Sequence, residues 1–201
     1  IKTRQMEKDF LKKMSTIAIN ILILFFVIAG GIVLIISMDR KISYYTEKKD
    51  NLLTAEAAHY SWGMQLSQAM LNKAEFTGQK DETKCDFGMF LYGEEIKGNP
   101  KMQEFFSKVE PVHKTLHESA TRVIGLNKIN GNEALNEWNK VVQPTIDSLI
   151  DLLNEEIENT AKSVEKTENI LTILYGIIIA VGVAVTVIIY YTIYSTYRYV
   201  K

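Results

Sequence analysis

The chain has 201 residues, a mean hydropathy of -0.02 and nearly balanced charge, with 23 Lys and Arg against 24 Asp and Glu. It contains one cysteine and three histidines. A single cysteine excludes an intrachain disulfide, a four-cysteine zinc site, an iron–sulfur cluster ligated by this chain alone and the two-cysteine c-type haem motif. Sites built from one thiolate and a few imidazoles are compatible with this composition.

Two uncharged apolar stretches divide the chain, one from Met14 to Met38 and one from Asn169 to Tyr197. Because about 20 apolar helical residues cover the ~30 Å hydrocarbon core of a bilayer, we expect transmembrane helices over 15–38 and 170–197. A signal peptide has a shorter apolar region that ends in a small-residue cleavage site, which favours a retained first helix. Asn20 is the only strongly polar side chain deep in the first span, and we expect it to face a partner helix.

The charge differs between the segments that these spans define. Residues 1–38 carry a net charge of +3, residues 39–169 a net of −6, and residues 198–201 a net of +2. Basic flanks stay on the cytoplasmic side of a membrane, so both ends are predicted to lie inside and the middle outside. We therefore expect a cytoplasmic segment over 1–14, an extracytoplasmic domain over 39–169 and the start of a cytoplasmic region at 198–201.

The middle segment is predicted to be helical, because it lacks the sustained alternation of half-buried strands. Apolar residues recur three and four apart over 39–76, and Thr77-Gly78 ends that pattern. Three further helices are expected, over about 86–97, over about 101–127, and from 133 through the second span.

The fold class expected from this pattern is all-α, an antiparallel four-helix bundle between two transmembrane helices. Pro111 and Pro144 lie inside helical patterns, and each predicts either a kink or a boundary because proline removes a backbone hydrogen bond.

Every histidine and the only cysteine lie within 59 residues: His59, Cys85, His113 and His117. His113 and His117 are four residues apart, so on a helix both imidazoles lie on one face and can share a metal ion. Three imidazoles and one thiolate complete a tetrahedral shell that suits zinc best, with copper and haem as chemical alternatives. The competing interpretation is that these residues bind no metal. His59 would then be an ordinary surface or core histidine, and Cys85 would pack as a small buried apolar side chain.

Two short motifs accompany these candidates. Trp62 follows His59 by three residues, and the sequence Cys85-Asp86-Phe87-Gly88 precedes the H-x₃-H pair. Over about residues 52–124 this pattern resembles the chemoreceptor zinc-binding domain family. The resemblance implies a small four-helix bundle that binds zinc through His59, Cys85, His113 and His117. Asp86 and Glu118 are the carboxylates expected to support these ligands.

The layout of a helical bundle between two spans also suggests a cellular setting. It looks like the sensory module of a two-pass bacterial chemoreceptor, similar to a methyl-accepting chemotaxis protein, in the inner membrane and, from the charge distribution, with its central domain in the periplasm. Such receptors are typically homodimers. We expect an output region after Lys201 through which cytoplasmic signalling partners are reached.

Three roles for the zinc follow from these expectations. Zinc binding or release could itself be the stimulus, or oxidation of the thiolate could loosen the metal. Alternatively the zinc is structural, in a receptor for another small ligand. A separate alternative concerns the whole chain, which would be the input domain of a sensor kinase or diguanylate cyclase. The aromatic residues that could line a pocket for such a ligand are Tyr60, Trp62, Phe87, Phe90 and Tyr92.

Catalysis and nucleic-acid binding are not expected. Four ligands fill a tetrahedral shell, whereas catalytic zinc keeps an open position, and the sequence contains no H-E-x-x-H motif. The net charge of −6 over 39–169 disfavours a nucleic-acid partner.

Overall fold

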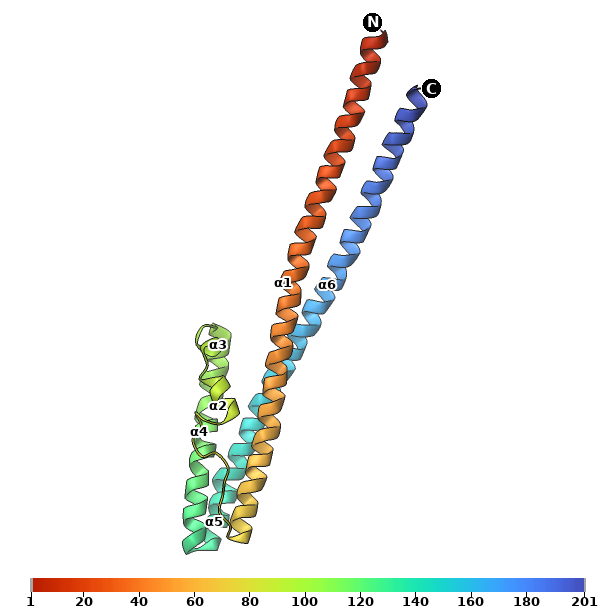
Figure 1. Cartoon of the computed structure of the whole chain (residues 1–201). Coiled ribbons are helices and arrows are strands. Elements are labelled where there is room, and N and C mark those ends of the chain that lie inside the picture. The colour runs from red at the N-terminus through yellow and green to blue at the C-terminus, as the bar shows by residue number, and fades with distance from the viewer. Residues whose placement is uncertain (1, 201) are drawn as a thin grey trace. The chain divides into compact units, whose positions relative to one another are not determined.

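The computed structural model describes residues 2–200, which are helical almost throughout (Figure 1). Two long helices, α1 (Lys2–Asn72) and α6 (Gln143–Val200), are separated by shorter elements. In chain order these are α2 (Asp86–Leu91), α3 (Glu94–Lys97), α4 (Pro100–Ile129), α5 (Gly131–Glu137) and the π-helical turn η1 (Trp138–Val142). The prediction of an all-α fold with long helices packed together is confirmed.

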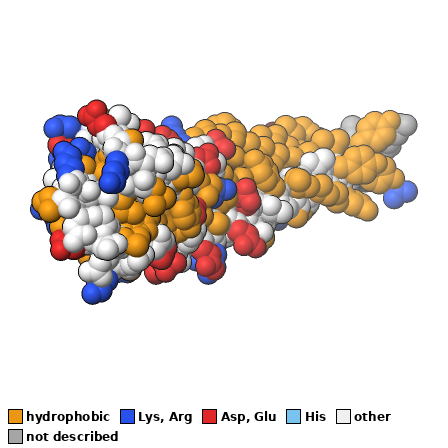
Figure 2. Space-filling model, turned by 90° about the horizontal axis from the view of Figure 1, so that it is seen from below, with side chains coloured by type: hydrophobic (Ala, Val, Ile, Leu, Met, Phe, Trp, Pro, Cys, Tyr) orange, Lys and Arg blue, Asp and Glu red, His pale blue; other side chains and the backbone are white. Residues whose placement is uncertain are grey.

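The chain forms two compact units, one of residues 1–44 and 163–201 and one of residues 45–162. In the first unit, the helices are long and apolar enough to cross a membrane by length and composition, and their most apolar windows are only 6% buried. Figure 2 shows hydrophobic side chains covering these helices, while charged side chains gather on the helices of the other unit.

Two residues of the first unit are placed in detail. A Cβ on Gly31 would lie 2.6 Å from Cδ1 of Ile178, so glycine at this position permits the close approach of α1 and α6. The Asn20 side chain donates a hydrogen bond to the Thr16 carbonyl at 3.0 Å. This bond lies within α1, and the expected contact of Asn20 with a partner helix stays a prediction.

The second unit begins with the C-terminal part of α1. This helix ends earlier than the sequence predicted. Lys73 has a φ of 51°, and the Ala74 amide donates to the Ala69 carbonyl at 2.9 Å. This left-handed residue, together with a bond across six residues, is a Schellman ending. The helix therefore stops at Asn72 rather than at Thr77-Gly78.

A strap without regular helix, residues 73–85, leads from α1 to α2 and is followed by two short helices instead of the single one predicted over 86–97. They separate at Tyr92 and Gly93, where Gly93 takes an extended conformation with φ −69° and ψ 163°. The strap and the short helices return the chain to the start of α4 (Figure 1).

The two prolines within helices behave differently. Pro111 lies inside an unbroken α4. Pro144 is the second residue of α6, which begins where the π-helical turn at 138–142 ends. A proline ring collides with the carbonyl four residues earlier in a regular helix, and the wider π-helical turn relieves that contact.

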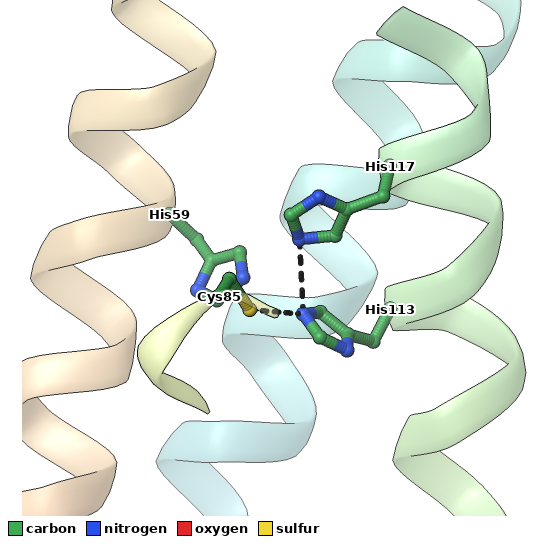
Figure 3. Close-up of side chains that lie close together, drawn as sticks. All are labelled: His59, Cys85, His113 and His117. Atoms are coloured by element: carbon green, nitrogen blue, oxygen red, sulfur yellow. Dashed lines mark hydrogen bonds between the residues drawn. The ribbon is translucent and has the colours of Figure 1, made fainter. Parts of the chain in front are cut away.

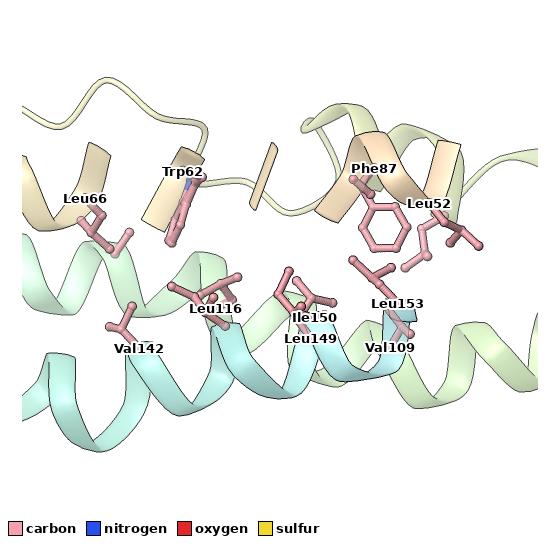
Figure 4. Packing of buried hydrophobic residues seen from close by; sticks show 14 of the residues in the cluster. Leu52, Trp62, Leu66, Phe87, Val109, Leu116, Val142, Leu149, Ile150 and Leu153 are labelled. Carbon is pink, nitrogen blue, oxygen red and sulfur yellow. The ribbon is translucent and has the colours of Figure 1, made fainter. Parts of the chain in front are cut away.

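The core of the second unit lies between α1, α4 and α6 and is capped by α2 (Figure 4). Its fully buried side chains are mostly aliphatic, and they include Leu52, Leu66, Val109, Leu116, Leu149 and Leu153. A mostly buried ion pair between Lys48 and Glu156 joins α1 to α6. The Asn127 amide donates to the Met70 carbonyl at 2.7 Å and joins α4 to α1.

Candidate metal centre

Four side chains from three parts of the second unit converge on one point (Figure 3). They are His59 on α1, Cys85 just before α2, and His113 and His117 on α4. One nitrogen or sulfur atom from each lies within 4.8 Å of the others. Nε2 of His113 is 3.1 Å from Nε2 of His117 and 3.3 Å from Sγ of Cys85. The structure thus brings together every site residue that the sequence predicts.

The convergence follows from the apolar pattern of the two long helices. His113 and His117 stand on the core face of α4 in series with the buried Val109, Leu116 and Ala120. His59 is buried on the core face of α1, three residues before Trp62. Packing the apolar faces of α1 and α4 together therefore brings the three imidazoles into contact, with ring centroids of His113 and His117 4.6 Å apart.

Backbone carbonyls orient two of the imidazoles. Nδ1 of His59 lies 2.7 Å from the Ala55 carbonyl, and Nδ1 of His117 lies 2.9 Å from the Gln79 carbonyl. A carbonyl can only accept a hydrogen bond, so each Nδ1 carries the proton and each Nε2 is left with a free lone pair. This is the arrangement by which metal-binding histidines are held in proteins.

The third imidazole is held differently. Nδ1 of His113 is buried and has no hydrogen-bond partner among the described residues. Its ring makes an edge contact with Phe87, with centroids 5.2 Å apart. Packing, rather than a hydrogen bond, therefore sets the orientation of His113.

Cys85 occupies the N-cap of α2, where its sulfur accepts a hydrogen bond from the Gly88 amide at 3.1 Å. A Cβ on Gly88 would lie 1.8 Å from the Glu82 carbonyl oxygen, so only glycine fits beneath the strap. Phe87, on α2, is buried, and its ring makes edge contacts with the imidazoles of His59 and His113. The motif Cys85-Asp86-Phe87-Gly88 thus supplies a donor, a packing residue and a close backbone contact.

The Gln79 carbonyl is a supporting group that sequence reasoning missed. Besides His117, the Trp62 indole N–H donates to this oxygen at 2.7 Å. The Trp62 ring lies 5.2 Å from the His117 ring and 5.4 Å from Phe76, centroid to centroid. Trp62 therefore anchors the strap over the site. The sequence singles out Trp62 by its place in the H-x-x-W motif. Gln79 lies in a polar loop, and no motif in the sequence marks it as part of the site.

The carboxylates predicted to support the ligands do not do so. Asp86 and Glu118 are both exposed, and the hydrogen bonds from the imidazoles go to the carbonyls of Ala55 and Gln79 instead. Sequence proximity fails here because Glu118 follows His117 on the outer face of α4.

Burial controls the protonation of the four groups. Burial lowers the pKa of His59 to about 4 and that of His113 to about 2, the latter with help from the neighbouring His59 and His117. It also lowers the pKa of His117 and raises the pKa of the Cys85 thiol. At neutral pH the imidazoles are therefore neutral and ready to bind a cation, while the thiol must lose a proton to become a ligand.

A cavity of about 340 Å³ adjoins the cluster and is lined in part by His59, Cys85 and His117. Of the aromatic residues predicted to form a pocket, Trp62, Phe87 and Phe90 line it. Tyr60 is instead exposed, and Tyr92 donates its hydroxyl to Glu110 at 3.1 Å.

Comparison with known proteins gives one result that bears on this site. Residues 59–124 match the model of the chemoreceptor zinc-binding domain, and this segment includes all four donors. No match to the chain is found among curated proteins or among solved structures. The match and the set of three imidazoles and one thiol together identify the cluster as a zinc site, within a domain that spans 66 of the 201 residues.

Proposed function

We propose that the chain is the transmembrane sensory module of a bacterial chemoreceptor, and that its helical bundle binds zinc through His59, Cys85, His113 and His117. The observation that carries the proposal is the convergence of these four donors within 4.8 Å, inside the segment that matches the chemoreceptor zinc-binding domain.

The proposed ligand atoms are Nε2 of each histidine and the thiolate of Cys85. Hydrogen bonds to carbonyls occupy Nδ1 of His59 and of His117, and Nε2 of His113 already lies beside the other donors. Bound zinc would neutralise the thiolate and hold α1, the start of α2 and α4 to one point. A change in zinc occupancy would then alter the packing of these elements, which is the change that a sensor needs.

We propose a non-catalytic role. Catalytic zinc keeps a position open for water, whereas four protein donors close a tetrahedral shell. The four donors here lie within 4.8 Å of one another, a set that could hold a single ion.

The membrane placement is part of the proposal. Its support is the length and apolar character of the two helices and the distribution of charge, +3 before residue 39, −6 over 39–169 and +2 after 197. We propose spans over 15–38 and 170–197, with the zinc-binding domain in the periplasm. The receptor is proposed to be a homodimer that acts on cytoplasmic signalling proteins, without a nucleic-acid partner.

A second candidate is a structural zinc in a receptor that senses another small ligand. The cavity of about 340 Å³ beside the cluster favours it, because its aromatic and polar walls could hold such a ligand. Titration of the zinc-loaded chain with a chelator separates the two. A sensor loses zinc reversibly and keeps its helical circular dichroism, whereas a structural zinc unfolds the bundle as it leaves.

The proposed zinc site is tested by metal analysis of the purified full chain in detergent. We expect one zinc per chain, and loss of that zinc in His117→Ala and Cys85→Ala. Glu118→Ala is the matched control, since this neighbour of His117 is exposed and should keep the zinc. A wild-type chain without zinc after loading, or a Cys85→Ala variant with unchanged zinc affinity, would show the proposal to be wrong.

The membrane placement needs its own test. A reporter that works only outside the cytoplasm should be active when it is fused within the strap, for example after Lys80. A reporter that works only inside the cytoplasm should be active when it is fused after Arg198. The reverse pattern at either position would refute the topology while leaving the zinc site untouched.

A further inference from the structure

The cavity beside the metal centre extends from exposed residues of the second unit to three of the four donors. Its inner wall includes the buried imidazoles of His59 and His117 and the half-buried Cys85. Its outer wall includes exposed residues of α1, among them Thr54 and Ala58. A cation that moves between solvent and the cluster can therefore pass through this space.

A carboxylate residue stands on the wall of this cavity. Asp86 follows Cys85 directly, is exposed and belongs to the lining. No ion pair joins it to a Lys or Arg side chain that the structure describes. Lys84, the other charged residue of the lining, is paired with Asp81 at 2.6 Å. The charge of Asp86 is thus left uncompensated at the cavity.

Carboxylates act on the donors from the side of α2 and the strap. Burial raises the pKa of the Cys85 thiol, and the neighbouring Asp86 carboxylate raises it further. Burial lowers the pKa of His117, whereas a backbone hydrogen bond and the charges of Glu82 and Asp81 raise it. Negative charge close enough to affect the donors in this way also attracts a cation toward them.

The position of Asp86 in α2 gives it one other possible role. It lies in the first turn of the helix, where a negative charge stabilises the amino terminus. It makes no hydrogen bond to the imidazoles, which are held by the carbonyls of Ala55 and Gln79. A test of Asp86 must therefore separate an effect on the metal from an effect on the helix.

We propose that the Asp86 carboxylate is a transient zinc ligand, which binds the ion in the cavity on its way to the four donors and again as it leaves. Carboxylate oxygens are ordinary ligands of zinc. This role rests on the proposed function, because it requires the zinc site. A group that contacts the ion only in transit lowers the barrier in both directions, so it changes the rates of binding and release more than the affinity.

Stopped-flow kinetics of the purified full chain in detergent tests the proposal. Zinc uptake by the metal-free chain gives the association rate, and transfer of zinc to an excess of chromophoric chelator gives the dissociation rate. In Asp86→Asn we expect both rates to fall about tenfold, the lower end of what charge contributes in a cleft, with Kd changed by less than about threefold. Asp86→Glu retains the carboxylate and should retain both rates.

Glu118→Gln is the matched control. Glu118 is also an exposed carboxylate next to a zinc donor in the sequence, but it does not belong to the cavity lining, so its loss should leave both rates unchanged. Two results for Asp86→Asn would overturn the proposal. One is unchanged rates. The other is faster release with weaker affinity, as the loss of a charge that only stabilises α2 would give.

A relocated carboxylate provides the second measurement, away from α2. Ala57 and Ala58 are neighbours on α1 and both are exposed, but of the two only Ala58 lines the cavity. In the Asp86→Asn background we expect Ala58→Glu to restore faster uptake and release, and Ala57→Glu to leave both slow. Equal rates in the two double variants would contradict a route through this cavity.

Equilibrium titration of the same proteins with zinc keeps this proposal distinct from the zinc site itself. A wild-type chain that binds no zinc would refute the site and the route together. A wild-type chain that binds zinc, with rates that do not depend on Asp86, would refute the route alone.

Discussion

At the scale of single residues, the metal centre depends on groups that donate nothing to the metal. The Gln79 carbonyl accepts from both His117 and Trp62, and the Ala55 carbonyl accepts from His59. Hydrogen bonds of this kind fix the tautomer and the direction of a metal-binding imidazole. Substitutions of residues that hold these two carbonyls in place should therefore lower the zinc affinity, although these residues do not bind the metal themselves.

Replacing Trp62 by phenylalanine tests this dependence. The change keeps an aromatic ring beside His117, but it removes the indole N–H that holds the Gln79 carbonyl together with part of the ring volume. We expect zinc to bind about tenfold more weakly, the lower end of such effects, with unchanged helix content. Competition with a chromophoric chelator measures the affinity. Trp138→Phe, at the other tryptophan of the chain, is the control and should not change it; equal affinities in all three proteins would contradict this role.

The protonation of Cys85 predicts how zinc binding depends on pH. Burial raises the pKa of its thiol, so at neutral pH zinc must displace that proton, whereas the imidazoles are neutral because burial lowers their pKa, to about 4 for His59. Affinity should therefore rise with pH, about tenfold per unit through the neutral range, with about one proton released. Calorimetry in buffers of different ionisation enthalpy counts that proton. Cys85→Ala loses the stoichiometric zinc, and any weak binding that its imidazoles retain at excess zinc should release no proton; proton release unchanged in that variant would assign it to another group.

The donors themselves were predictable and their supports were not. The chain has three histidines and one cysteine, and the H-x₃-H spacing places two of them on one helical face. The carbonyl of Gln79 reaches the site only because the strap folds back across α1, a path that no local pattern encodes. Asp86 and Glu118 were expected as supports from sequence proximity alone, and helical geometry places Glu118 on the solvent side.

At the scale of elements, α2 is a short helix whose start is built around the thiol. Cys85 caps it, Phe87 packs on the imidazoles, and Gly88 lies against the Glu82 carbonyl. A helix of six residues has little stability of its own, so these contacts hold it in place. The position of Cys85 therefore depends on Gly88.

A pair of glycine substitutions tests this dependence. Gly88→Ala puts a methyl group 1.8 Å from the Glu82 carbonyl oxygen, so the strap must move and take Cys85 with it. We expect a loss of about 1–3 kcal/mol in stability, the usual cost of overpacking, together with weaker zinc binding. Gly125→Ala, on α4 with no atom within 4 Å of the new methyl group, should gain about 0.5–1 kcal/mol instead. Thermal unfolding with and without zinc checks both, and a Gly88→Ala protein as stable as wild type would contradict the close contact.

The long helices were predicted from sequence better than the connections between them. Apolar spacing located α1, α4 and α6, because each helix must bury a continuous face. The end of α1 at Asn72 depends on the left-handed backbone conformation of Lys73. Lysine rarely adopts this conformation, and no sequence pattern predicts it here. The π-helical turn at 138–142 ends just before Pro144, where the proline in the sequence predicted only a kink or a boundary.

At the scale of the whole molecule, the zinc site joins segments that are distant in sequence. His59 and His117 are 58 residues apart, and the metal would bind both together with the start of α2. Hydrophobic contacts already hold α1, α4 and α6 together, as the buried Leu66, Leu116 and Leu149 show. Zinc should thus stabilise a bundle that is largely formed by its core.

Removing zinc from the full chain should lower the unfolding temperature without abolishing the helical signal. At free zinc a hundredfold above its dissociation constant, the expected stabilisation is about 2.7 kcal/mol. Differential scanning calorimetry with and without chelator measures the effect. His117→Ala provides the reference and should unfold at one temperature in both conditions; an equal unfolding temperature for the wild type would mean that zinc does not bind the folded bundle.

The most direct measurement is X-ray absorption at the zinc edge of the purified, zinc-loaded chain. We predict one sulfur at about 2.3 Å and three nitrogens at about 2.0–2.1 Å, with the sulfur shell lost in Cys85→Ala. A zinc shell of nitrogen and oxygen alone in the wild-type chain, or a sulfur shell that persists without Cys85, would contradict this prediction.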